Sequence, residues 1–111
     1  MSRPEQRQSE RIATDLPIRI ERGDAVIDAR TINMSLGGVL VDVRLSPAAT
    51  IGERFGIALA LPTLPDPLRA QAEVRWIGLT GEHGLQFVTG FRAKETWALG
   101  QWLDKIRKGS P

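Results

Sequence analysis

The chain has 111 residues, of which 41% are hydrophobic and 25% charged, and it carries a formal net charge of +2. This length and composition are typical of a single globular domain that folds in water, and they exclude a disordered chain. There is no cysteine and only one histidine, His83, which excludes disulfide bonds, thiolate nucleophiles and a histidine metal cluster. We therefore predict no metal site.

The hydropathy pattern gives no sign of a membrane segment. No apolar run approaches the roughly 20 residues that cross a bilayer. The first eleven residues, MSRPEQRQSER, lack the apolar centre of a signal peptide. We therefore expect no membrane insertion and a cytoplasmic location.

Residues 1–13 form a polar arm without apolar periodicity, which we expect to be mobile by itself. Twelve of the fifteen basic residues are arginine, and Arg3, Arg7 and Arg11 lie in this arm at a spacing of four. A guanidinium group is planar and can hydrogen-bond a phosphate or a guanine edge through two N–H groups. The arm therefore favours an anionic or aromatic partner. A solvated surface is the alternative interpretation.

The middle of the chain is a series of short segments rich in branched residues, each bounded by glycine, proline or a polar turn. They cover residues 16–22, 25–33, 38–43, 54–61, 68–78 and 83–88. This spacing predicts an antiparallel barrel or sandwich over residues 14–90. The segment LPTLPDP holds three prolines and is predicted to be a loop between strands.

One of these segments shows a clear alternation. Ala70, Ala72, Val74 and Trp76 share one face, and the residues between them are polar. The alternation predicts that this face points inward and that Trp76 is a core residue.

The last part of the chain changes period. Leu99, Trp102, Leu103 and Ile106 fall at i, i+3, i+4 and i+7, which predicts a helix packed on the barrel through an apolar stripe. We therefore divide the single domain into an arm (1–13), a barrel (14–90) and a helix with its tail (91–111).

A polar break, NMSLGG, separates the second and third of the predicted strands. One interpretation is a wide turn in which Asn33 and Ser35 bond their own backbone and glycine supplies a positive φ. The other is a concave binding site, because glycines let a ligand approach the main chain closely and leave N–H groups for an anion. In an extended chain Asn33 and Ser35 point the same way and could bind one ligand together.

The arm and the polar break together resemble the PilZ domains, bacterial receptors for the second messenger cyclic di-GMP. The family motif RxxxR is present as RQSER, with Arg7 and Arg11, and the motif [D/N]xSxxG is present as NMSLGG, with Asn33, Ser35 and Gly38. AEVRWI, HGLQFV and the closing helix extend the similarity over nearly the whole chain. The resemblance implies a six-stranded antiparallel β-barrel with a C-terminal α-helix.

The resemblance also implies a ligand and the residues that bind it. Arg7 and Arg11 would stack on or hydrogen-bond the guanines of cyclic di-GMP and would hydrogen-bond its phosphates. Asn33 and Ser35 would contact the ligand from the barrel surface. Gly38 would keep that surface open, and Gly37 would help for the same steric reason.

Two further residues carry weaker predictions. Some family members place an aromatic residue near the guanine, which makes Trp76 a further candidate beside its interpretation as a core residue. Arg3 repeats the arginine spacing and is a candidate to assist binding, although we favour a plain charged tail for it.

The function predicted from these observations is a receptor that captures cyclic di-GMP with its arm and signals to an effector protein not identified by the sequence, without another cofactor. A family-like scaffold that binds no nucleotide is one alternative. A small barrel that binds single-stranded nucleic acid is another, although such surfaces usually display stacking aromatics on their strands. An enzyme is not expected, because the single histidine forms no recognisable catalytic set.

Overall fold

The structure is a computed structural model that describes residues 11–88 and 91–107. Its strands are β1 (Ile12–Ala13), β2 (Pro17–Arg22), β3 (Ala25–Met34), β4 (Gly38–Asp42), β5 (Arg54–Leu59), β6 (Leu68–Ile77) and β7 (Glu82–Phe87), and the helix α2 (Ala93–Arg107) follows them. The six segments predicted to be strands correspond to β2 to β7, and the proline-rich segment between β5 and β6 is a loop, as predicted.

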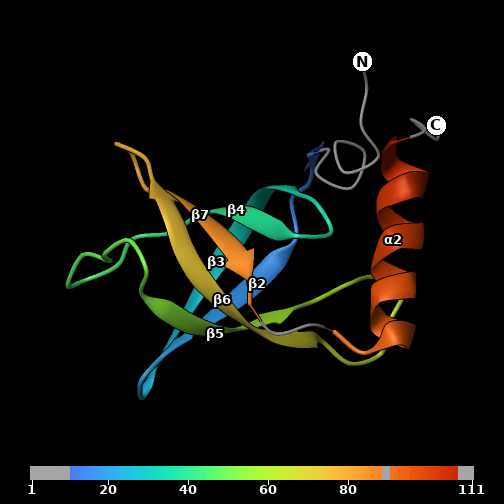
Figure 1. The fold of residues 1–111 in the computed structure, drawn as a ribbon, viewed down its shortest axis with the longest axis horizontal. Helices are drawn as coiled ribbons and strands as arrows, with labels where there is room; N and C mark the ends of the chain where they lie inside the picture. The colour runs from blue at the N-terminus through green and yellow to red at the C-terminus, as the bar shows by residue number, and fades with distance from the viewer. Residues whose placement is uncertain (1–10, 89–90, 108–111) are drawn as a thin grey trace.

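Strands β2 to β7 form a closed antiparallel barrel. The order of hydrogen-bonded neighbours is β3, β2, β5, β6, β7 and β4, and β4 returns to pair with β3. Closure removes the unpaired edges that an open sheet would expose. Figure 1 shows this barrel with α2 standing beside one end of it. The predicted six-stranded barrel with a C-terminal helix is confirmed.

The short strand β1 extends the barrel at β3. Ile12 lies opposite Met34 and Ala13 opposite Asn33, and Ile12 packs against the core. The sequence analysis assigned these two residues to the arm, but an apolar side chain at Ile12 gives the chain a reason to join the sheet there. The rest of the predicted arm, residues 1–10, lies outside the described residues.

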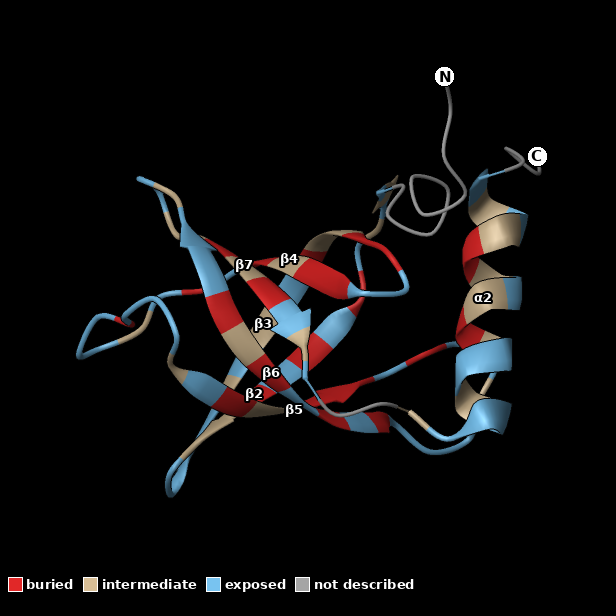
Figure 2. Ribbon diagram, in the orientation of Figure 1, coloured by how far each residue is buried: buried red, intermediate tan, exposed pale blue. Residues whose placement is uncertain are grey.

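The core fills the inside of the barrel and the space under α2. Figure 2 shows buried and exposed residues alternating along several strands, as expected where one face of a sheet is covered. Phe55, Ile57 and Leu59 of β5 are buried at one side of the core, and Leu99 and Leu103 of α2 are buried at the other. The predicted apolar stripe is therefore the face by which α2 packs.

Strand β6 departs from the predicted alternation near its end. Its inward residues are buried up to Val74, but Trp76 is 52% exposed. The register against β7 shifts at this point, where Val74 pairs with Leu85 and Trp76 with Gly84. An extra residue in one strand reverses the inward and outward sense of the residues that follow. The interpretation of Trp76 as a core residue is therefore wrong.

Candidate functional site

The polar break between β3 and β4 folds as a tight turn. The backbone N–H of Ser35 donates to the carbonyl oxygen of Gly38 at 2.9 Å, and the N–H of Gly37 donates to Ser35 Oγ at 3.2 Å. Ser35 is buried and only 4% exposed. Its hydroxyl therefore holds the turn together from inside, as in the turn interpretation of this segment.

The two glycines of this turn differ in their surroundings. In the described part of the chain, positive φ occurs at Gly23, Gly52 and Gly81, so the expectation of a positive φ in this turn is wrong. A Cβ on Gly38 would instead overlap the carbonyl oxygen of Leu85 in β7, whereas a Cβ on Gly37 would have Ser35 Oγ at 4.0 Å as its nearest neighbour. Gly38 allows β4 to approach β7, and Gly37 leaves the surface of the turn open.

Arg11 comes from a different part of the chain and meets the same region. Its Nη1 donates to Asn33 Oδ1 at 3.2 Å. The register of β1 explains this contact, because Ala13 pairs with Asn33 and Ile12 with Met34, so that Arg11 enters beside the turn. An arginine of the first motif and the asparagine of the second therefore touch, 22 residues apart in the sequence.

A hollow of about 730 Å³ lies over this turn and the neighbouring ends of β6 and β7. Five of the predicted site residues line it, namely Arg11, Ser35, Gly37, Gly38 and Trp76. Asn33 is connected to the hollow through its hydrogen bond with Arg11. The remaining predicted residue, Arg7, lies outside the described residues, as does Arg3. The hollow combines a guanidinium, an aromatic ring and open backbone, which suits a planar, anionic ligand.

Five residues that the sequence analysis did not select also line the hollow: Leu36, Arg75, Gly84, Leu85 and Gln86. Leu36 could have been found from its place inside the second motif. Arg75 is one of the polar residues that alternate with the predicted inward face of its strand, and Gln86 comes from β7, the strand that pairs with β4. Finding them needed the strand pairing, which places Gln86 opposite Gly38 and opposite Glu73.

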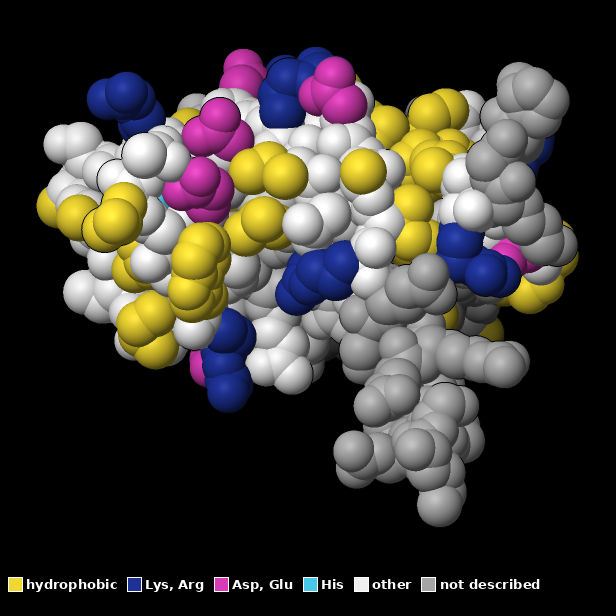
Figure 3. All heavy atoms as spheres, turned by 90° about the horizontal axis from the view of Figure 1, so that it is seen from above, with side chains coloured by type: hydrophobic (Ala, Val, Ile, Leu, Met, Phe, Trp, Pro, Cys, Tyr) yellow, Lys and Arg dark blue, Asp and Glu magenta, His cyan; other side chains and the backbone are white. Residues whose placement is uncertain are grey.

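Basic side chains are dispersed over the face of the molecule that Figure 3 shows. In the view of Figure 3, Lys and Arg side chains stand apart from one another, separated by hydrophobic and uncharged side chains. A nucleic-acid backbone binds best to a continuous basic surface. The described residues on the face seen in Figure 3 form no such continuous surface.

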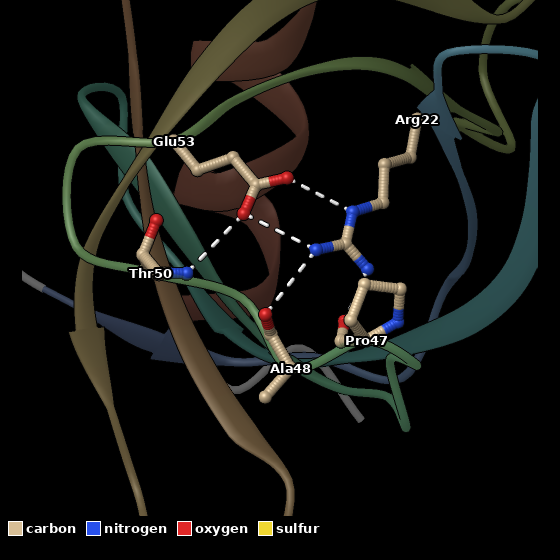
Figure 4. Close-up of polar contacts among 5 residues, drawn as sticks. All are labelled: Arg22, Pro47, Ala48, Thr50 and Glu53. Carbon is tan, nitrogen blue, oxygen red and sulfur yellow. Dashed lines mark hydrogen bonds and ion pairs between the residues drawn. The ribbon is translucent and has the colours of Figure 1, made fainter.

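Another arginine, Arg22, lies outside the hollow and forms a cluster of contacts that serves the fold. Arg22 donates from Nε to Glu53 Oε2 at 2.9 Å and from Nη2 to Glu53 Oε1 at 3.3 Å. It also donates to the carbonyl oxygens of Pro47 and Ala48, and its guanidinium lies 5.7 Å from the ring centroid of Phe55. Figure 4 shows these contacts gathering the loop between β4 and β5 around one guanidinium.

The contacts of Arg22 also change the pKa of Glu53. The side-chain hydrogen bonds from Arg22 are the main reason that the pKa of Glu53 is lowered from its ordinary value, and the N–H of Thr50 adds to the effect. Desolvation opposes the shift but is the smaller effect. The cluster is therefore built around a charged carboxylate.

The sequence model of the PilZ domain matches residues 5–104. The chain belongs to the PilZ domain family. This family consists of cyclic di-GMP receptors and adaptors, which in general bind ligands and partners rather than catalyse reactions. No curated protein matches the chain.

Two solved structures share the PilZ fold with this chain. The inhibitor of motility MotI/DgrA from Bacillus subtilis aligns with a TM-score of 0.79 at 20% identity, over 90% of this chain and 50% of that one. This PilZ domain thus spans about half the length of that protein. The PilZ domain of CeSA from a cellulose-synthesizing bacterium aligns with a TM-score of 0.68 at 15% identity, over 88% of this chain and 98% of that one.

The residues matched by the PilZ model include all those that line the hollow. The family match includes both motifs, and the fold brings Arg11 of the first to Asn33 of the second. In the described part of the chain, no helix is long and apolar enough to cross a bilayer.

Proposed function

We propose that this PilZ domain is a receptor for cyclic di-GMP and that it binds the nucleotide in the hollow over the β3–β4 turn. The observation that carries the proposal is the meeting of the two motifs, since Arg11 Nη1 donates to Asn33 Oδ1 at 3.2 Å while Arg11, Gly37 and Trp76 line one hollow. Cyclic di-GMP presents two phosphates and two guanines, which match guanidinium forks and an exposed aromatic ring.

Each residue has a role in this proposal. Arg11 bonds a phosphate or a guanine edge, and Arg7 acts with it from the arm. Asn33 holds the Arg11 side chain at the rim, and the turn at Ser35 and Gly37 presents backbone to the ligand. Fixing a chain segment on a ligand opposes binding by roughly 1 to 2 kcal/mol per residue. An affinity near micromolar, or about −8 kcal/mol, is therefore expected.

The signal passes from the ligand to an effector protein through the elements that touch the hollow. Arg11 is continuous with β1, and β1 packs beside α2. Leu36 of the turn reaches the same helix, since its Cδ2 lies 3.9 Å from where a Cβ on Gly100 would be. A ligand that moves Arg11 or the turn therefore acts on two segments that contact α2, and a changed arm and helix surface is what the effector recognises.

The test is calorimetric titration of cyclic di-GMP into the protein, with GTP as the nucleotide control. We expect selective binding, with a stoichiometry of one nucleotide or a stacked pair per domain. Substituting Arg11→Ala should weaken binding by at least roughly a hundredfold, because its charge-assisted bonds to the ligand are lost.

Arg19→Ala is the matched control for that substitution. Arg19 is exposed and ion-paired with Asp28 at 3.2 Å on a surface outside the hollow. The Arg19→Ala variant should bind cyclic di-GMP with the affinity of the wild type. Absence of cyclic di-GMP binding by the wild-type protein would contradict the proposal and favour a scaffold. Equal losses of affinity in Arg11→Ala and Arg19→Ala would mean that the hollow is not the binding site.

A further inference from the structure

The bulge in β6 changes which side chains face the hollow. Before it, the strand alternates regularly, with Ala72 and Val74 buried and Gln71 exposed. Two adjacent residues of a regular strand point to opposite faces, yet Arg75 and Trp76 are both exposed and both line the hollow. The register shift between Val74 and Trp76 accounts for this, because the extra residue re-aims the side chains beside it.

The strand opposite the bulge leaves room for the indole. Trp76 pairs with Gly84, where a Cβ would lie 3.3 Å from Trp76 Cβ. Gly78 is similarly close, since a Cβ there would lie 2.8 Å from an atom of the Trp76 ring. Two glycines therefore fix where Trp76 lies, next to Arg75.

The guanidinium of Arg75 is held at one corner only. Its Nη1 donates to Gln86 Oε1 at 3.1 Å and contacts Glu73 Oε2 at 3.4 Å. With the residues that the structure describes, its Nε and Nη2 form no hydrogen bond, and the side chain is 60% exposed. Gln86 and Glu73 thus orient the group while the edge formed by Nε and Nη2 keeps its donors for a ligand.

We propose that Arg75 is a further arginine of the ligand site and that it recognises the O6 and N7 edge of a guanine while Trp76 packs on a base. This inference rests on the proposed function and assigns to it a residue outside both sequence motifs. A guanidinium fork matches two adjacent acceptors, and guanine O6 and N7 present them. A bulge that places a fork and a ring side by side suits recognition of a base by its edge and its face.

The surroundings of Arg75 favour a base over a phosphate. Glu73 carries a negative charge beside Nη1 and also accepts from Arg54 Nε at 3.3 Å. This carboxylate repels a second anion at the same guanidinium, which weakens a phosphate contact. A neutral pair of acceptors on a guanine does not meet that repulsion, and its recognition depends on the planar fork.

The experiment compares three substitutions on β6 by titration with cyclic di-GMP. Arg75→Ala should weaken binding roughly tenfold or more, because one bidentate base contact is lost. Arg75→Lys should be nearly as weak, since an ammonium keeps the charge but lacks the fork. Arg69→Ala, on the same strand and the same outer face, removes an equal charge from an exposed pair with Glu21 and should bind within about twofold of the wild type.

Three outcomes overturn the inference. Wild-type affinity in Arg75→Ala would remove Arg75 from the site while leaving cyclic di-GMP binding intact, and wild-type affinity in Arg75→Lys would mean a phosphate contact instead of a base contact. Absence of binding by the wild-type protein would overturn the proposed function and the inference together. Thermal unfolding of each variant, expected to stay close to the wild type for these exposed positions, separates lost contacts from lost folding.

Discussion

Arg22 and Arg11 each lie beside a loop that joins two strands of the barrel. The Arg22 side chain is only 18% exposed and gives its donors to Glu53 and to the carbonyl oxygens of Pro47 and Ala48. Arg11 is exposed, and in the described part of the chain it makes a single hydrogen bond, to Asn33 Oδ1. One guanidinium is surrounded by its own protein, and the other faces a hollow.

The difference teaches that the number of internal partners separates an arginine that serves the fold from one whose donors are left for a ligand. Arg22 could bind a ligand only by giving up bonds that hold the β4–β5 loop, which would offset most of the gain. Arg11 and Arg75 have donors that no described residue uses, so a ligand adds contacts without removing many. A similar distinction applies to the two glycines of the β3–β4 turn: both line the hollow, but Gly38 is packed against Leu85 and Gly37 is not.

The largest effect we expect is on folding, from Gly38→Ala. Its Cβ would overlap the carbonyl oxygen of Leu85, so β4 and β7 must separate, and the free energy of unfolding should fall by about 2 to 3 kcal/mol. Gly37→Ala is the matched control, because a Cβ there has 4.0 Å to its nearest neighbour and should change stability by less than about 0.5 kcal/mol. Urea unfolding of both variants measures the difference. Equal stabilities would contradict the conclusion that Gly38 is packed against β7 while Gly37 is open.

The next largest effect on stability is expected from substitution of Arg22, the arginine that is bonded to its own protein. Arg22→Ala removes a bidentate contact to Glu53 and two bonds to loop carbonyls, and it should lower the free energy of unfolding by about 2 kcal/mol. Arg11→Ala should change that free energy by less than about 0.5 kcal/mol, since its single bond is exposed. Chemical denaturation gives both values. If Arg11→Ala proved the more destabilising of the two, the comparison would be reversed.

The barrel itself could be predicted from the sequence because its strands follow simple alternation and its breaks carry glycine and proline. The helix could be predicted for a similar reason, since Leu99 and Leu103 repeat at helical spacing and are buried together. These are local patterns. They need no knowledge of which strand pairs with which.

The parts that the sequence could not predict depend on pairing. The exposure of Trp76 follows from a register shift against β7, and no residue in AEVRWI marks the bulge. Gln86 joins the hollow only because β4 and β7 are neighbours, which a list of strands does not establish. The reason for Gly38 is likewise a contact with Leu85, 47 positions away by the two residue numbers. The motifs predicted residues of the candidate site, and the closure of the barrel determined what else lines the hollow.

The smallest effect concerns the pH dependence of the Arg22 cluster. The pKa of Glu53 is lowered in the folded protein from an ordinary value of 4.5, so its ionised form is favoured by folding. This contribution is fully present above pH 4.5 and is lost as the pH falls through the lower folded pKa. In Glu53→Gln the contribution is absent, so the variant should be less stable than the wild type at pH 7. The difference between the two should shrink as the pH falls below 4.5.

Urea unfolding at a series of pH values between 7 and about 3 measures this difference. Asp28→Asn is the control for loss of one negative charge, because Asp28 is 84% exposed and its pair with Arg19 is open to solvent. A stability gap between wild type and Glu53→Gln that stayed constant through acid pH would mean that the ionised carboxylate does not hold the loop. The bonded arginine would then stabilise the β4–β5 loop through its carbonyl contacts alone, and the contrast with Arg11 would rest on burial instead of charge.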